Sequence, residues 1–223
     1  MFNIFQSQEK RINKKFEKLK KRNSFYDRNE LAVNIDITNK CALACLRCGR
    51  QFGYKDNGLK VPGREITLEE FDLISDHFSQ IGFCGQYSDP THHSRFIEFL
   101  NICKEKDVYA QIHVASSARS EKWFIEAFKA NPDATWIFGI DGKPEESHLY
   151  RVNQDGPKLF QIMLDSKKYL NNKPRWQYII FKYNQDYIEE AKDIAKKEGL
   201  LFFLIQSNRW IDDDPLKPTI GQF

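Results

Sequence analysis

Apolar residues recur at every second position in some segments of this chain and at helical spacing in others. The two kinds of segment follow each other in turn. Residues 31–37 place Leu, Val and Ile at every second position, which is typical of a strand with one buried face. Further on, Thr67 and Glu70 have the spacing of a capping box and predict a helix that continues to about Ser79. The chain therefore begins its regular part with a strand and then a helix.

The same succession of strand and helix continues to residue 205. Helical spacing recurs at 96–103, 123–128, 159–170 and 187–195, where Gly199 is placed to end the last helix. The strands between them are predicted at 81–84, 108–115, 135–140, 176–181 and 200–205. This alternation predicts an α/β protein of parallel strands with right-handed crossovers. Six strands are too few for a closed eight-stranded barrel. We therefore expect an open, partial (β/α)6 barrel with its site at the carboxyl ends of the strands.

Two segments lie outside this barrel, which we expect to span residues 31–209. Residues 1–30 form a basic extension with nine Lys and Arg against four Asp and Glu. Within it, residues 8–22 predict a basic helix, because apolar residues recur at helical spacing in Ile12, Phe16 and Leu19. We interpret it as an amphipathic helix on the body, with RNA or a membrane surface as the less favoured target. Residues 210–223 are expected to be a loosely held C-terminal tail.

Composition narrows the class of protein further. The 223 residues are 41% hydrophobic and 14% aromatic, enough to build a core and too much for a disordered chain. Mean hydropathy is −0.62 and no apolar run approaches the length of a membrane span, so we expect neither a transmembrane helix nor a secretory signal. The five cysteines, with three of them close together, do not form the pattern of a secreted disulfide framework. They favour metal ligation in a reducing compartment, the cytoplasm.

The three clustered cysteines follow directly after the first strand, at Cys41, Cys45 and Cys48. On a loop that leaves the carboxyl end of a strand, the spacing C-x3-C-x2-C can surround one metal centre. Thiolates are soft ligands that suit iron–sulfur clusters or zinc. Three local ligands leave one coordination position for another group. From spacing alone, structural zinc with His92 or His93 as its fourth ligand is the alternative.

The sequence at this point resembles the radical S-adenosylmethionine (radical SAM) enzymes, whose signature is this cysteine spacing after the first strand of a partial barrel. Four further blocks resemble the segments that follow the later strands of that family, at 83–90, 113–119, 139–151 and 181–184. The blocks occur in family order and cover about residues 31–206. The most similar branch comprises cofactor-biosynthesis cyclases and maturases with a cysteine-rich SPASM domain. Since no cysteine follows Cys103, we expect no SPASM domain here.

The resemblance implies a cofactor set and a reaction. Cys41, Cys45 and Cys48 would hold three irons of a 4Fe–4S cluster, and S-adenosylmethionine would bind the fourth. An electron from the reduced cluster would cleave S-adenosylmethionine to a 5′-deoxyadenosyl radical, which abstracts hydrogen from an unidentified substrate, whether a small molecule, a peptide or RNA. A low-potential donor such as flavodoxin or ferredoxin would supply the electron. No membrane partner is implied.

The same resemblance implies which residues bind S-adenosylmethionine: Gly85, Gln86, Asp89, Pro90, Ser116, Ser117, Asp141 and Arg151. The segment 85–90 would lie beside the methionine moiety, with its backbone and Asp89 accepting hydrogen bonds from the amino group. The two serines would bind the methionine carboxylate or the ribose. Asp141 is either a ribose contact or a turn residue. Arg151 is either a salt bridge that anchors a helix or a contact to substrate or cofactor.

Three positions depart from the family pattern. Arg47 stands where an aromatic residue commonly packs near adenine, Asp89 replaces a glutamate, and Ser116-Ser117 replaces Asn-Gly. These departures leave a second hypothesis open, a catalytically inactive, zinc-stabilised binding protein on the same scaffold. A third is an RNA-modifying radical SAM enzyme that uses the basic extension as an RNA clamp.

The remaining reactive side chains are predicted to have structural roles, whereas one long loop is predicted to have a functional role. We expect Cys84 and Cys103 to be core residues. The pair His92-His93 is interpreted as the polar start of a helix, with acid catalysis or substrate binding as the alternative. The long loop at 49–64 follows the cysteines at the mouth of the predicted barrel, so we expect it to close over substrate.

Overall fold

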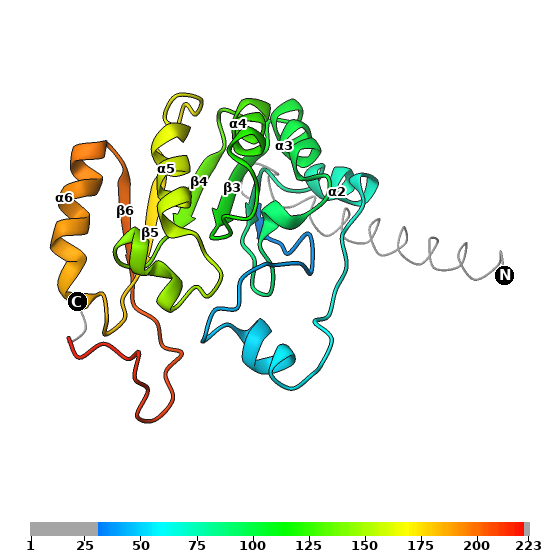
Figure 1. The fold of residues 1–223 in the computed structure, drawn as a ribbon. Coiled ribbons are helices and arrows are strands. Elements are labelled where there is room, and N and C mark those ends of the chain that lie inside the picture. Colours follow the sequence, from blue (N-terminus) through cyan, green and yellow to red (C-terminus); the bar gives the residue numbers. More distant parts are fainter. Residues whose placement is uncertain (1–30, 221–223) are drawn as a thin grey trace.

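The computed structural model describes residues 31–220, and its centre is one sheet of six parallel strands (Figure 1). Successive strands are hydrogen-bonded neighbours along the whole sheet, from β1 to β6. Among the described residues, β1 and β6 each pair on one side only, so the barrel is open. The predicted partial (β/α)6 barrel is confirmed. The strands are β1 (Ala32–Asn34), β2 (Gln80–Phe83), β3 (Tyr109–Val114), β4 (Thr135–Gly139), β5 (Arg175–Ile179) and β6 (Leu201–Ile205).

Five α-helices connect the strands, and they cover one face of the sheet (Figure 1). They are α2 (Leu68–Ser75), α3 (Phe96–Glu105), α4 (Glu121–Ala130), α5 (Gly156–Ser166) and α6 (Ile188–Glu198). The predicted capping box starts α2, because Thr67 Oγ1 accepts from Glu70 N and Glu70 Oε2 accepts from Thr67 N. Gly199 ends α6 in the left-handed conformation, with φ of 70°. None of the helices in the described part is long and apolar enough to cross a membrane.

The structure differs from the prediction where elements are short. β1 ends at Asn34, although residue 35 still donates its N–H to Gly82 O at 2.9 Å. The sequence does not predict four short helices, because each contains too few residues to show a helical repeat. They are the π-helix η2 (Gln51–Lys55) and the 3₁₀-helices η3 (Pro90–His92), η4 (Pro144–Leu149) and η5 (Gln185–Tyr187). The predicted helix at 8–22 lies outside the described residues.

The C-terminal segment 206–220 is held in place, so the prediction of a loosely held tail is wrong. Near its start, the ring of Trp210 packs edge-on against Phe181, with 5.7 Å between ring centroids. Near its end, Thr219 N donates to Gln185 Oε1 at 2.8 Å. Both partners belong to the connection between β5 and α6. The segment is fixed because these side chains give it partners that its own composition does not reveal.

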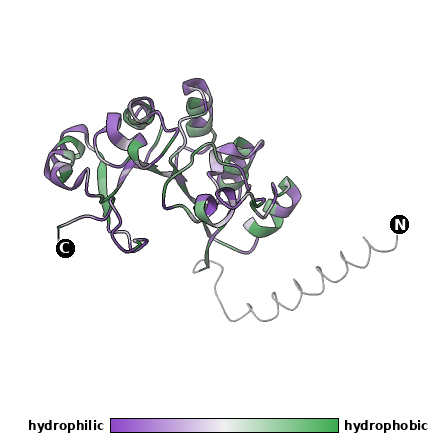
Figure 2. Ribbon diagram, turned by 60° about the horizontal axis from the view of Figure 1, so that its bottom comes forward, coloured by the Kyte–Doolittle hydropathy of each residue, from purple (hydrophilic) through white to green (hydrophobic). Residues whose placement is uncertain are grey.

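Aromatic side chains fill the space between the sheet and the helices. Phe71 of α2 stacks on Phe99 of α3 with ring centroids 4.3 Å apart, and Trp136 of β4 meets Phe128 of α4 edge-on at 4.8 Å. Figure 2 shows that the hydrophobic side of the helices faces the sheet. On β3, Ala110, Ile112 and Val114 are buried toward the helices. Gln111 and His113, which alternate with them on the concave face, are only half-buried. The concave face is thus left for a site.

Phe99 is the residue on which we test this core. Its side chain is fully buried, so Phe99→Ala is expected to lower the free energy of unfolding by about 3–5 kcal/mol through lost burial and a residual cavity. Urea denaturation followed by circular dichroism measures the change. Leu73→Ala on the exposed side of α2, where Leu73 is 48% exposed, should change it by only about 0.5 kcal/mol. Equal losses in both variants would contradict this description of the core.

Candidate active site

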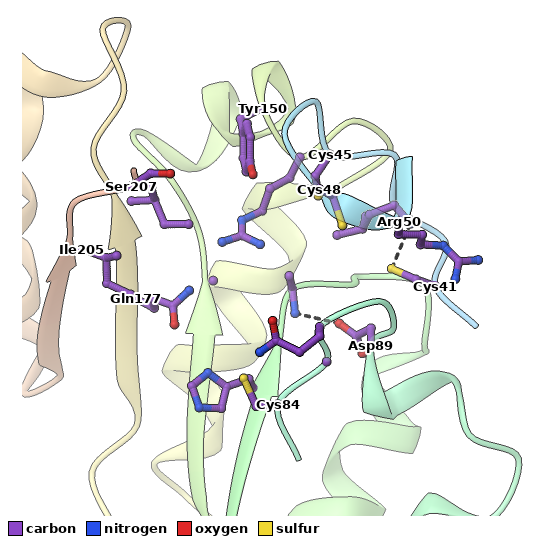
Figure 3. Close-up of a pocket in the computed structure, with 18 of the residues that line it drawn as sticks. Cys41, Cys45, Cys48, Arg50, Cys84, Asp89, Tyr150, Gln177, Ile205 and Ser207 are labelled. Carbon is purple, nitrogen blue, oxygen red and sulfur yellow. Dashed lines mark hydrogen bonds between the residues drawn. The ribbon is translucent and has the colours of Figure 1, made fainter. Parts of the chain in front are cut away.

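A cavity of about 490 Å³ opens where the strands end. Its wall is formed by the loops after β1, β2, β4 and β6 and by residues near the ends of β3, β4, β5 and β6. In Figure 3 the three clustered cysteines lie on one side, and Gln177, Ile205 and Ser207 face them from across the cavity. Of the residues predicted from sequence, those that line it are Cys41, Cys45, Cys48, Gly85, Gln86, Asp89 and Arg151.

The cysteine loop is held by backbone contacts to two other loops. Ala44 N donates to Val152 O at 3.0 Å and Leu46 N donates to Tyr150 O at 3.3 Å, which ties the loop to the connection after β4. On the other side, Arg50 is buried and its Nη1 donates to two carbonyl oxygens, of Asn39 at 2.6 Å and of Tyr87 at 2.9 Å. A guanidinium that joins two loops in this way fixes the cysteine loop against the loop after β2.

The thiols themselves are sheltered from water. Burial raises the pKa of Cys41 to about 12 and that of Cys45 to about 11, and the nearby guanidinium groups of Arg50 and Arg151 oppose the rise only in part. Such thiols become thiolates when a cation binds them. Within residues 31–220, no three His, Cys, Asp or Glu side chains converge closely enough to hold a single metal ion. Three soft donors spread along one cavity wall fit a multi-iron cluster, in which different cysteines bind different irons.

The loop after β2 is folded tightly against the end of β1. A Cβ added to Gly85 would lie 1.6 Å from Ser88 O, so only glycine fits there. Asp36, two residues beyond the end of β1, accepts from Gln86 N at 3.0 Å and from the hydroxyl of Ser88. Pro90 begins η3 and lies outside the cavity lining. Of the predicted segment 85–90, residues 85–89 line the cavity that the cysteines share.

Asp89 joins this loop to the end of β3. One carboxylate oxygen accepts from the backbone N–H and the hydroxyl of Thr91, and the other accepts from Ala115 N and Ser116 N, each at 2.9 Å. A carboxylate has about four acceptor positions, and these bonds occupy all of them. A predicted bond to the amino group of S-adenosylmethionine would need one of them to break.

Ser116 and Ser117 are buried and lie outside the cavity lining. The Ser116 hydroxyl is 2.8 Å from His92 Nε2, and the Ser117 hydroxyl accepts from Asp155 N at 2.8 Å. Their hydroxyls therefore fasten the loop after β3 to η3 and to the start of α5. The structure does not bring them together with the cysteines, because the chain has already left the cavity wall at Ala115.

Asp141 and Arg151 form a buried ion pair. Arg151 Nε donates to Asp141 Oδ2 at 2.7 Å, and Asp141 Oδ1 also accepts from Ile179 N at 2.8 Å. The Asp141 carboxylate raises the pKa of the Arg151 guanidinium although burial alone would lower it, so the arginine stays charged. Asp141 lies behind the wall and Arg151 lines the cavity. The guanidinium passes directly over Gly139, where a Cβ would lie 2.7 Å from Nη2.

Comparison with known proteins identifies the fold. SuiB from Streptococcus suis bound to S-adenosylmethionine matches with a TM-score of 0.67 and 13% identity, over 85% of this chain and 44% of that one. The enzyme anSMEcpe with bound AdoMet matches with a TM-score of 0.61 and 14% identity, over 78% and 49%. Methylornithine synthase (PylB) matches with a TM-score of 0.57 and 13% identity, over 88% and 61%. All three are radical SAM enzymes. This chain has the radical SAM fold.

The chain spans about half the length of SuiB and anSMEcpe. Neither the comparison with family models nor that with curated proteins finds a match. The similarity therefore concerns the fold of the barrel and gives no information on the reaction.

Around that cavity, two predictions about single residues have different outcomes. Cys103 is buried in the core as expected, whereas Cys84 is half-buried and lines the cavity, so its prediction as a core residue is wrong. The reason is that Cys84 follows β2 on the concave side.

The two histidines have structural partners. His92 Nε2 lies 2.8 Å from the Ser116 hydroxyl, while His93 Nε2 lies 3.0 Å from Ile66 O and its Nδ1 accepts from Arg95 N.

Sequence reasoning missed the side chains that the radical SAM barrel directs into its interior. They are His113 of β3, Ile137 of β4, Gln177 and Ile179 of β5, and Phe203 and Ile205 of β6. Burial lowers the pKa of His113, which favours its neutral form. The signal was present, because alternate positions of each predicted strand face the same side. The sequence alone does not tell which side of each strand faces the cavity.

Gly85 offers the sharpest test of the loop after β2. Gly85→Ala places a methyl group against the backbone of Ser88, so the loop has to shift, and the free energy of unfolding is expected to fall by about 1–3 kcal/mol. Gly53→Ala is the matched control, since a Cβ there meets nothing within 4 Å. Urea denaturation of both variants provides the measurement. A Gly85→Ala protein as stable as Gly53→Ala would show that the loop is not packed as described.

Proposed function

We propose that this protein is a radical SAM enzyme. Cys41, Cys45 and Cys48 hold a 4Fe–4S cluster, and S-adenosylmethionine binds beside it in the cavity. The observation that carries the proposal is that the three cysteines of a C-x3-C-x2-C motif line one cavity at the carboxyl ends of a radical SAM barrel, together with the loop that begins at Gly85. The fold alone supports no chemistry, but this set of residues in this place does.

When bound, the cluster would supply the electron for reductive cleavage of S-adenosylmethionine, and so the radical chemistry for hydrogen abstraction from the substrate. The chain's own residues bind and orient. Backbone carbonyl groups of the loop 85–88 would bind the amino group of S-adenosylmethionine, and the guanidinium of Arg151, which lines the same cavity, would attract its carboxylate. The inward side chains of β4, β5 and β6 are mainly apolar and would keep water from the reacting groups.

The substrate is unidentified, and its class is a small molecule, a peptide or RNA. It would bind across the cavity from the cysteines, where Gln177 and His113 offer neutral hydrogen-bonding groups among apolar side chains. The electron comes from a low-potential donor such as flavodoxin or ferredoxin. Such a cluster requires reduced thiols, which supports a cytoplasmic location.

The two other hypotheses gain no support from the described residues. A zinc-stabilised binding protein needs four converging ligands, and no three potential ligands converge between residues 31 and 220. The RNA-clamp hypothesis depends on the basic extension 1–30, which lies outside the described residues.

The proposal is tested by anaerobic reconstitution with iron and sulfide. Dithionite and S-adenosylmethionine are then added, and 5′-deoxyadenosine is measured by chromatography. The wild-type protein is expected to be brown and to form 5′-deoxyadenosine. Cys45→Ala should lose a cluster ligand, and its 5′-deoxyadenosine should fall to background. Cys84→Ser is the matched control, because Cys84 lines the same cavity outside the motif, and this variant should still assemble the cluster.

A colourless wild-type protein that binds stoichiometric zinc would contradict the proposal. So would a cluster that assembles equally well in Cys45→Ala and in the wild type, because the motif would then not be its ligand set.

A further inference from the structure

One ion pair joins the cysteine loop to the C-terminal segment. Arg47 Nε donates to Asp214 Oδ2 at 2.7 Å and Arg47 Nη2 donates to Asp214 Oδ1 at 3.0 Å, so the contact is bidentate. The side chain of Asp214 is 0% exposed and that of Arg47 is 24% exposed. The two residues are 167 positions apart in the chain, so this contact fixes two distant segments to each other.

The far side of this pair is itself anchored. Asp214 Oδ1 also accepts from Leu216 N at 3.0 Å, and Leu216 O accepts from Lys182 N at 2.9 Å in the connection after β5. The hydrogen bonds from Arg47 lower the pKa of the Asp214 carboxyl, so it is ionised at neutral pH. A chain of contacts therefore runs from the end of β5 through Asp214 to the cysteine loop.

The near side of the pair lies between two of the proposed cluster ligands. Arg47 follows Cys45 by two residues and precedes Cys48 directly. Its neighbour Leu46 is exposed, and the N–H of Leu46 donates to Tyr150 O. The side chain of Arg47 binds this part of the loop to Asp214. The segment that it binds begins with residues 206–209, which form part of the cavity wall.

We infer that Arg47 and Asp214 are positioning residues, which hold Cys45 and Cys48 in place by clamping their loop to the C-terminal segment. The inference rests on the proposed function, since the thiols are positioned for the cluster and for S-adenosylmethionine beside it. It also gives a physical reason for Arg47 at a position where the family resemblance leads one to expect an aromatic residue. The side chain at this position binds the C-terminal segment.

The test uses the full-length protein and three variants of the pair: Arg47→Ala, Asp214→Asn and Arg47→Ala combined with Asp214→Asn. Gln185→Ala is the matched control, because it removes the contact to Thr219 at the end of the segment and leaves the ion pair in place. Trypsin cleavage after the exposed Arg209 in the metal-free protein reports whether the segment is still held. The change in the electron paramagnetic resonance signal of the reduced cluster on adding S-adenosylmethionine reports whether the thiols are still positioned.

Both single variants are expected to be cleaved faster by trypsin than the wild type. Their KM for S-adenosylmethionine should rise roughly 10- to 100-fold, as for other residues that support metal ligands, and the change in the resonance signal should shrink. The double variant should be no worse than the worse single variant, because the two residues act as a unit. Gln185→Ala should leave both the KM and the resonance signal as in the wild type.

Three results would overturn the inference while the proposed function stands. The first is an active wild type together with unchanged KM and resonance signal in both single variants. The second is strictly additive effects in the double variant. The third is a loss in Gln185→Ala equal to that in Arg47→Ala, which would mean that any contact of the segment serves equally well. A wild type without a cluster would refute the proposed function, and unchanged trypsin cleavage of its variants would then refute the clamp separately.

Discussion

Parallel pairing of the strands is the constraint on which the rest of this structure depends. Because every strand runs in the same direction and pairs with the strand before it in the chain, all carboxyl ends meet at one edge of the sheet. The loops after β1, β2 and β6 are therefore brought together although their residues are far apart in the chain. The cysteines, the segment at Gly85 and residues 206–209 share one cavity for this reason. The helices occupy the other face and leave the interior of the barrel to the site.

Buried charged side chains at this edge join the loops to one another. Arg50 binds two carbonyl oxygens, Asp89 accepts four hydrogen bonds, and Arg151 is paired with Asp141. Removing a charged group from water is unfavourable unless it gains partners of this kind, so each charge selects one arrangement of the loops around it. That is why several residues that resemblance would assign to the cofactor, Asp89 above all, have their polar atoms occupied by neighbouring loops.

The sequence was sufficient for the fold, because apolar runs and periods mark the strands and helices, and residues such as Thr67 and Gly199 mark helix ends. The sequence was also sufficient to predict that the three clustered cysteines share one site, since their spacing is local. It was insufficient for Ser116 and Ser117, because whether a hydroxyl faces a cavity or a neighbouring loop depends on the exact turn after β3. It could not give the contact between Arg47 and Asp214 either, since nothing in either segment alone indicates a partner 167 residues away. The C-terminal segment was misjudged for the same reason.

The cysteine loop is arranged by residues other than its cysteines, and this bears on how a cluster would assemble. Its backbone is bound to Val152 and Tyr150, and its flanks are fixed by Arg50 and Arg47. In small zinc domains the metal itself folds the chain, and the binding free energy is then spent on ordering the ligands. Here the ligands are ordered beforehand by polar contacts that need no metal. Less of the binding free energy would then be lost to ordering the ligands when the proposed cluster binds. A cluster held by these three cysteines, as proposed, would leave one iron open to a small molecule in the cavity that the interior side chains of β3 to β6 line.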